Sequence, residues 1–134
     1  MLKDIPNPAV ENIVIAVVRE SNEENEQVWN VYVVNLYKEK IENVLVSSTG
    51  YGTLNGRDVK TTVLRHMIGD IESNDCAKIE PIMSDVFGLT NEYWISFYIN
   101  KQIYDKKYVF LPESIMEENF TMIPVLDKMG VMIR

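Results

Sequence analysis

The sequence is poor in the residues that build reactive centres. Its 134 residues include one cysteine, one histidine and four arginines, all scattered along the chain. The single cysteine, Cys76, excludes an intrachain disulfide and favours a reducing compartment. Cys76 and His66 supply only part of the roughly four nitrogen or sulfur ligands of a structural zinc site, which excludes a site of that kind within one chain. We expect no metal, no cofactor and no catalytic residue.

Long apolar runs and clustered positive charge are also missing. The longest apolar run, Ile13–Val18, is far too short to cross a bilayer, and residues 1–8 lack the apolar core of a signal peptide. The 13 basic residues are outnumbered by 20 acidic ones, which gives a net charge of −7. Because nucleic acids and anionic membranes bind clustered cations, both classes of partner are disfavoured. We predict a cytoplasmic protein.

The sequence is rich in short segments of β-branched and aromatic residues that are separated by turn residues. Such segments are typical of β-strands. The clearest are Asn12–Glu20, Val28–Tyr37, Ile41–Ser48, Lys78–Met83, Tyr93–Ile99 and Tyr104–Leu111. The connections between the first three are too short for parallel crossovers, so we expect these strands to form an antiparallel meander.

Residues 59–71 fit two patterns. Apolar residues recur every four positions, as on one face of a helix, at Val59, Val63, Met67 and Ile71. Apolar and polar residues also alternate, as in a strand, and both the β-branched Thr61 and the interior Gly69 weaken the helix. We favour a strand and keep a helix as the alternative.

About seven short strands, with no long helical pattern between them, predict an all-β fold of the two-layer antiparallel β-sandwich type. In outline the pattern is immunoglobulin-like or fibronectin-like, although the Cys–Trp–Cys core of immunoglobulin domains is absent. If residues 59–71 are helical, the fold becomes α+β with one sheet. We expect a single domain over residues 1–134, in which residues 112–134 form a C-terminal extension.

The glycine-rich segment Gly50–Gly56 is predicted to be a flexible loop. It lacks the Gly-Lys-Ser/Thr ending of a phosphate-binding loop, because Arg57 and Asp58 follow it. Positions that need a positive φ explain its glycines more simply. We still expect a partner to touch this loop, and its Tyr51 is a candidate interaction residue.

If Ile95, Phe97 and Ile99 of the strand Tyr93–Ile99 face the core, alternation places Trp94 and Tyr98 together on the opposite face. Tryptophan and tyrosine on an outward face are typical interface anchors. The alternative is that both faces of this strand are covered and that the C-terminal tail lies over one of them. The candidate interaction residues are Trp94, Tyr98, Tyr51 and Trp29.

These features favour a non-enzymatic module that binds a protein partner or self-associates, through this aromatic face or an exposed strand edge. The run Ile13–Val18 is apolar on both faces, so it is either covered on both sides or leaves one side for association. The alternative is a small-ligand binder or an enzyme, whose pocket would join His66, acidic side chains and the segment Gly50–Gly56. RNA or tRNA association is a third hypothesis and predicts salt-sensitive binding.

Taken whole, the chain resembles a group of small uncharacterised bacterial proteins of similar length. The resemblance is carried by Lys3–Pro6, Val28–Asn35, Val44–Tyr51, Leu64–His66, Ala77–Glu80, Asp85–Asn91 and Gly130–Ile133. Some members of the group carry the label of phenylalanine–tRNA ligase alpha subunit. That activity does not fit this sequence, because the catalytic fold of such enzymes is much larger and Asn55 stands where their ATP-binding arginine would fall. The resemblance transfers no catalytic motif.

Overall fold

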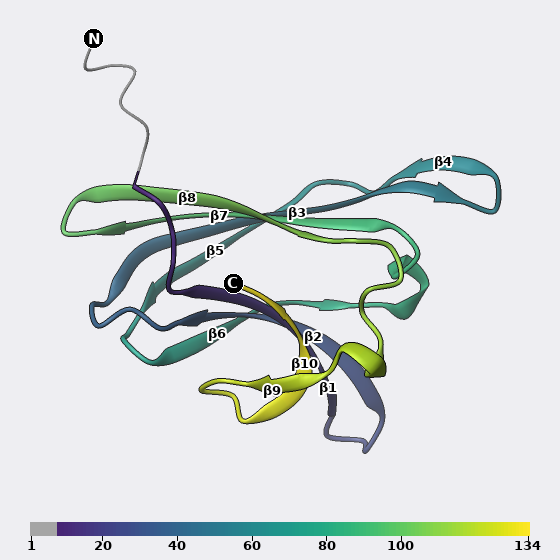
Figure 1. The fold of residues 1–134 in the computed structure, drawn as a ribbon, viewed down its shortest axis with the longest axis horizontal. Helices are drawn as coiled ribbons and strands as arrows, with labels where there is room; N and C mark the ends of the chain where they lie inside the picture. Colours follow the sequence, from purple (N-terminus) through teal and green to yellow (C-terminus); the bar gives the residue numbers. More distant parts are fainter. Residues whose placement is uncertain (1–7) are drawn as a thin grey trace, which may run out of the picture.

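The computed structural model describes residues 8–134 and confirms the all-β fold. Strands make up 63% of the described residues, and two antiparallel sheets pack together as a sandwich. Figure 1 shows the two layers, with β8, β7, β3, β5 and β4 in one layer and β6, β2, β1, β10 and β9 in the other. Within the described residues, no helix has the length and apolar character needed to span a membrane.

The first layer, which we call sheet A, contains five strands. Their spatial order is β6 (Asp75–Ile82), β2 (Gln27–Asn35), β1 (Ile13–Ser21), β10 (Lys128–Ile133) and β9 (Thr121–Ile123). The second layer, sheet B, contains β4 (Arg57–Lys60), β3 (Ile41–Leu54), β7 (Thr90–Ile99) and β8 (Gln102–Phe110) in that order, and β5 (Leu64–Ile71) also pairs with β3. Every pairing is antiparallel.

The described residues form ten strands, so the predicted number of seven is wrong. The sequence pattern missed the short strands β4 and β9, and it left β10 inside the C-terminal segment. The helix considered over residues 59–71 is also wrong, because these residues fall largely in β4 and β5. Both strands pair with β3, and this ladder satisfies the backbone groups that a helix would otherwise bond internally.

The segment Gly50–Gly56 is not a loop, as was predicted, but belongs mostly to a strand. β3 continues to Leu54, and the chain turns at Asn55 and Gly56, whose φ angles are 53° and 77°. Two consecutive residues with positive φ make the turn that matches the twist of a tight β-hairpin. The resulting β3–β4 hairpin extends from one end of sheet B in Figure 1.

The predicted meander holds for β1 and β2 but is wrong for β3. β2 pairs with β1 and β6, whereas β3 pairs with β4, β5 and β7 in the other sheet. Residues 36–40 therefore carry the chain from sheet A to sheet B. Residues 72–74, between β5 and β6, carry it back to sheet A beside the first crossing. A short connection thus links two layers here instead of two neighbouring strands.

Asn35 joins the two crossings. Its side chain is fully buried, and its amide nitrogen lies 3.0–3.1 Å from the backbone carbonyl oxygens of Glu39, Ile71 and Glu72. Its side-chain oxygen accepts a 2.9 Å hydrogen bond from the backbone N–H of Tyr37. Because the Asn35 side chain is itself fully buried, its hydrogen bonds to both connections hold them beside each other.

The main core lies between the sheets, where Tyr93, Tyr108, Phe97 and Phe110 are the largest fully buried side chains. A second apolar cluster lies on the outer face of sheet A and consists of Val14, Ala16, Val18, Val34 and Ile123, all without solvent exposure. Ile123 comes from the C-terminal segment 112–134, which contributes β9 and β10 to sheet A. The run Ile13–Val18 is therefore covered on both sides by its own chain.

Gly130 allows β10 to lie close against β1. A Cβ atom at this position would lie 2.4 Å from the carbonyl oxygen of Val17 and 3.0 Å from the Cα atom of Val18. Both contacts are with backbone atoms, which cannot move aside as a flexible side chain can. The C-terminal strand therefore needs a glycine at this position to complete sheet A.

We expect the Asn35→Ala variant to lose about 3 kcal/mol of unfolding free energy, because it removes a buried amide that bonds three carbonyl groups and leaves the buried carbonyl of Ile71 without this donor. Asn119→Ala is the matched control, since it removes one exposed hydrogen bond, to the carbonyl oxygen of Ser114. The control should cost less than about 1 kcal/mol. Urea unfolding at neutral pH measures both values. Equal losses in the two variants would contradict the role of Asn35.

Candidate functional site

Three of the four predicted interaction residues lie on the outer face of sheet B. Ile95 in β7 is fully buried, so its neighbour Trp94 points outward, as does Tyr98; their exposed fractions are 47% and 38%. Tyr51 in β3 is 37% exposed, and its hydroxyl donates a 3.4 Å hydrogen bond to Glu92 of β7. Alternation along the two strands thus gathers these aromatic side chains on one surface.

We call this surface the outer face of sheet B and define it by its exposed apolar side chains, which are Leu45, Tyr51, Met67, Trp94 and Tyr98. Leu45 pairs in register with Met67 of β5 on one side and with Ser96 of β7 on the other. A hollow of about 280 Å³ lies on this face between Leu45, Met67, Tyr98 and Ile103. Met67, the most exposed of the set at 89%, stands at its rim.

The fourth predicted residue, Trp29, does not lie with the other three. Its ring packs edge-on against Phe87 at 5.0 Å and against Phe120 at 5.9 Å between centroids. The guanidinium of Arg19 lies 5.6 Å from the indole centroid. Trp29 is therefore half-buried within the fold, where it links β2 to the segments around residues 87 and 120.

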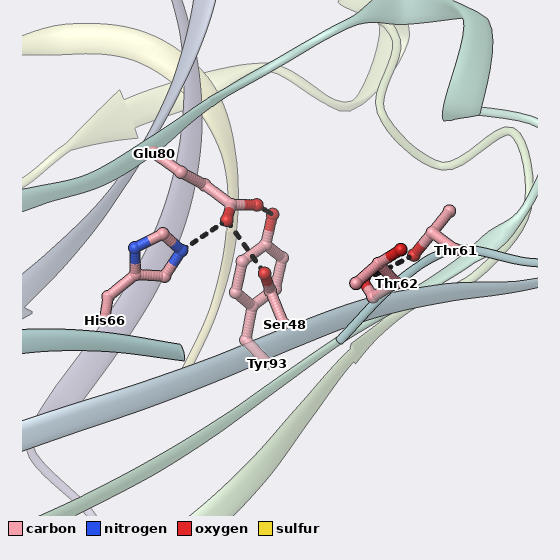
Figure 2. Close-up of polar contacts among 6 residues, drawn as sticks. All are labelled: Ser48, Thr61, Thr62, His66, Glu80 and Tyr93. Carbon is pink, nitrogen blue, oxygen red and sulfur yellow. Dashed lines mark hydrogen bonds and ion pairs between the residues drawn. The ribbon is translucent and has the colours of Figure 1, made fainter. Parts of the chain in front are cut away.

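A second candidate site is formed by three polar side chains around the carboxylate of Glu80, which Figure 2 shows. Ser48 Oγ and His66 Nε2 donate to Glu80 Oε1 at 2.8 and 2.7 Å, and the Tyr93 hydroxyl donates to Oε2 at 2.9 Å. Glu80 belongs to β6 of sheet A, while its three donors belong to β3, β5 and β7 of sheet B. We call this group the Glu80 cluster. It ties the two sheets together.

The electrostatics of the Glu80 cluster follow from burial. Burial, together with the charge and the hydrogen bond of Glu80, raises the pKa of the Tyr93 hydroxyl far above its usual value. Tyr93 therefore stays protonated, and its hydroxyl donates a hydrogen bond to the carboxylate. An ionised carboxylate can only accept, so the proton in the bond with His66 lies on Nε2. Ser48 and His66 both bond to Glu80, and this geometry differs from a serine–histidine pair, in which the imidazole accepts from the hydroxyl.

A groove of about 390 Å³ opens beside the Glu80 cluster, and Glu80, Ser48 and Tyr93 contribute to its wall. Another part of the wall is formed by Gly50 and Thr61, whose hydroxyl accepts a 2.8 Å hydrogen bond from the Gly50 N–H. Thr61 and Thr62, which connect β4 to β5, line part of the groove. The pocket predicted from the sequence joined His66, acidic side chains and the segment Gly50–Gly56. Of these, Gly50 and Glu80 line the groove and His66 bonds to Glu80, whereas residues 51–56 do not line it.

Sequence reasoning did not single out Ser48, Glu80 or Tyr93. No spacing along the chain links these residues, because each comes from a different strand and they meet only through the packing of the two sheets. Cys76 lies elsewhere, against the outer apolar cluster of sheet A, and burial raises the pKa of its thiol. In the part of the chain that the structure describes, no three histidine, cysteine or acidic side chains are grouped so as to hold a metal ion.

The comparisons with known proteins leave the family open. No protein-family model matches the chain, and no curated protein matches it either. The resemblance to small bacterial proteins, which was read from the sequence, therefore stays a prediction.

The raised pKa of Tyr93 predicts how stability depends on alkaline pH. An unfolded tyrosine loses its proton near pH 10, whereas folded Tyr93 holds it, so unfolding releases a proton and stability falls as the pH rises above about 10. The Tyr93→Phe variant should show a shallower decline above pH 10. Asn119→Ala, which removes no titrating group, should keep the wild-type slope. Unfolding by urea between pH 8 and pH 11 gives these slopes, and identical slopes in Tyr93→Phe and wild type would contradict the assignment.

Proposed function

We propose that this protein is a non-enzymatic interaction module that self-associates through the outer face of sheet B. One observation carries the proposal: large apolar side chains are exposed together on this face, while the corresponding face of sheet A is covered by the protein's own C-terminal segment. A contiguous exposed apolar patch on a small domain marks an association site. Trp94 and Tyr98 are the residue types that most often anchor such interfaces.

The charges on this face support a second copy of the chain as the partner. The register places Arg65 and Lys107 in one row with Trp94, and it places Glu92 and Asp105 in the rows on either side. It also places Glu42 opposite Tyr98 and Lys60 opposite Tyr51, so three basic and three acidic residues share the face. These opposite charges balance, although the whole chain carries −7. A neutral, apolar face gives little advantage to a strongly charged partner. Two such faces can meet around a twofold axis, as two sheets that pack face to face.

The remaining assignments from the sequence belong to the same proposal. A bacterial, cytoplasmic module agrees with the resemblance and with the single cysteine. The immunoglobulin-like description agrees with a two-sheet sandwich, an architecture widely used for recognition. Nucleic acid is a poor partner for a chain with this excess of acidic residues.

The variant Met67→Asp tests the proposal. The substitution places a charge on the proposed interface beside Leu45, and Met67 is 89% exposed in one copy, so the fold itself should be unaffected. We expect wild type to dimerise in sedimentation equilibrium and Met67→Asp to raise the dissociation constant at least tenfold.

Met122→Asp is the matched control, since Met122 is also exposed but lies in β9, away from sheet B. This variant should dimerise like wild type. A wild-type chain that stays monomeric at its highest soluble concentration, or equal weakening in both variants, would contradict self-association through this face. Recovery of a different protein that protects Met67 from solvent would replace the second copy as the partner.

A further inference from the structure

Glu80 carries a nearly buried charge that has no strongly basic partner. Its side chain is 12% exposed, and among residues 8–134 the only ion-pairing contact it makes is with His66. Glu20 offers a comparison within the same chain, since its side chain is 11% exposed. Burial acts to raise the pKa of Glu20, but hydrogen bonds from Lys128, Tyr32 and Asn30 outweigh it and lower the pKa. The donors to Glu80 are two hydroxyl groups and an imidazole, whereas the donors to Glu20 include the ammonium group of Lys128.

The groove beside Glu80 also contains no positive charge. Its lining includes the carboxylates of Glu80 and Asp85 but neither lysine nor arginine. The rest of the wall is largely apolar, with Leu64 and Met83 exposed by 49% and 72%. Such a lining repels anions. It offers an apolar body a surface and a cationic group a counter-charge in the same groove.

We propose that this groove binds an organic cation, an ammonium or guanidinium group carried on an apolar chain. A carboxylate has about four acceptor positions, and Ser48, His66 and Tyr93 occupy three of those of Glu80, so one acceptor position remains for the ligand. The apolar chain lies along Leu64 and Met83. The volume of about 390 Å³ is at the lower end for small-ligand sites. The groove lies at the open edge of the sandwich and does not depend on the proposed dimer interface.

The probe is n-butylammonium, with n-butanol and butyrate as its neutral and anionic counterparts. We expect n-butylammonium to shift the NMR resonances of Ser48, Glu80 and Asn91, and to saturate at a concentration at least tenfold lower than n-butanol does. Butyrate should leave these resonances in place. Equal effects of the three probes, or no effect at these residues, would overturn the proposal.

Variants at Leu64 test the role of charge without removing Glu80 from the fold. Leu64→Lys supplies a cation from the protein itself and should weaken n-butylammonium binding at least tenfold, whereas Leu64→Met, which has a similar length and no charge, should bind as wild type does. Equal loss in both variants would overturn the electrostatic argument. Leu45→Lys places the same charge on the outer face of sheet B, so it should weaken the dimer and leave the groove unchanged, which separates the failure of one proposal from the failure of the other.

The cation could belong to a free amine or to a side chain of a peptide. The capped peptide acetyl-Gly-Lys-Gly-amide distinguishes these sources, because it presents the same ammonium group beside backbone amides. Tighter binding of the peptide than of n-butylammonium supports a lysine side chain as the ligand, and weaker binding supports a free amine. Failure of both to bind would overturn the proposal.

Discussion

The hydrogen bonds of Asn35 are the constraint on which the arrangement of this sandwich depends. The buried amide bonds to backbone atoms in both connections between the sheets, the one from β2 to β3 and the one from β5 to β6. These bonds hold the two connections side by side. Apolar side chains alone would tolerate other pairings of these strands, whereas a buried amide with partners in both connections is satisfied only in this one. Because β5 and β6 lie at corresponding edges of the two layers, His66 and Glu80 can meet across the gap between them.

The two outer faces of the sandwich differ, and this difference shapes how the protein can associate. β10 lies close to β1 because of Gly130, and the segment that contains Ile123 covers the outer face of sheet A. The edges formed by β6 and β8 are also poorly suited to pairing, since Pro81 in β6 lacks a backbone N–H and charged side chains, Asp105 to Lys107, occupy β8. The apolar outer face of sheet B is therefore a better surface for association than an edge, and one face favours a closed dimer over a filament.

The sequence predicted what depends on neighbouring residues and missed what depends on distant ones. Alternation within β7 correctly placed Trp94 and Tyr98 on the face opposite the core residues, because the period of a strand is local, but it left open whether that face is covered. The turn at Asn55 and Gly56 was also a local signal, but the glycines before it were read as a loop. The Glu80 cluster could not be predicted, because its four members come from four strands of two sheets. The cover over Ile13–Val18 depended on the C-terminal strands, whose pairing no local pattern reveals.

A polar cluster at the edge of the sandwich has a physical reason. Ile71 of β5 and Ile79 and Ile82 of β6 still belong to the main core, but the groove opens beside them at this edge, so apolar packing does not close the gap between the sheets by itself. Hydrogen bonds to one carboxylate hold the edge strand β5 to sheet A through His66, and within the described residues no buried side-chain polar atom lacks a partner. The carboxylate that closes the edge in this way is also the charge that lines the groove. Replacing it with an apolar residue would remove both the link between the sheets and the counter-charge for a cation.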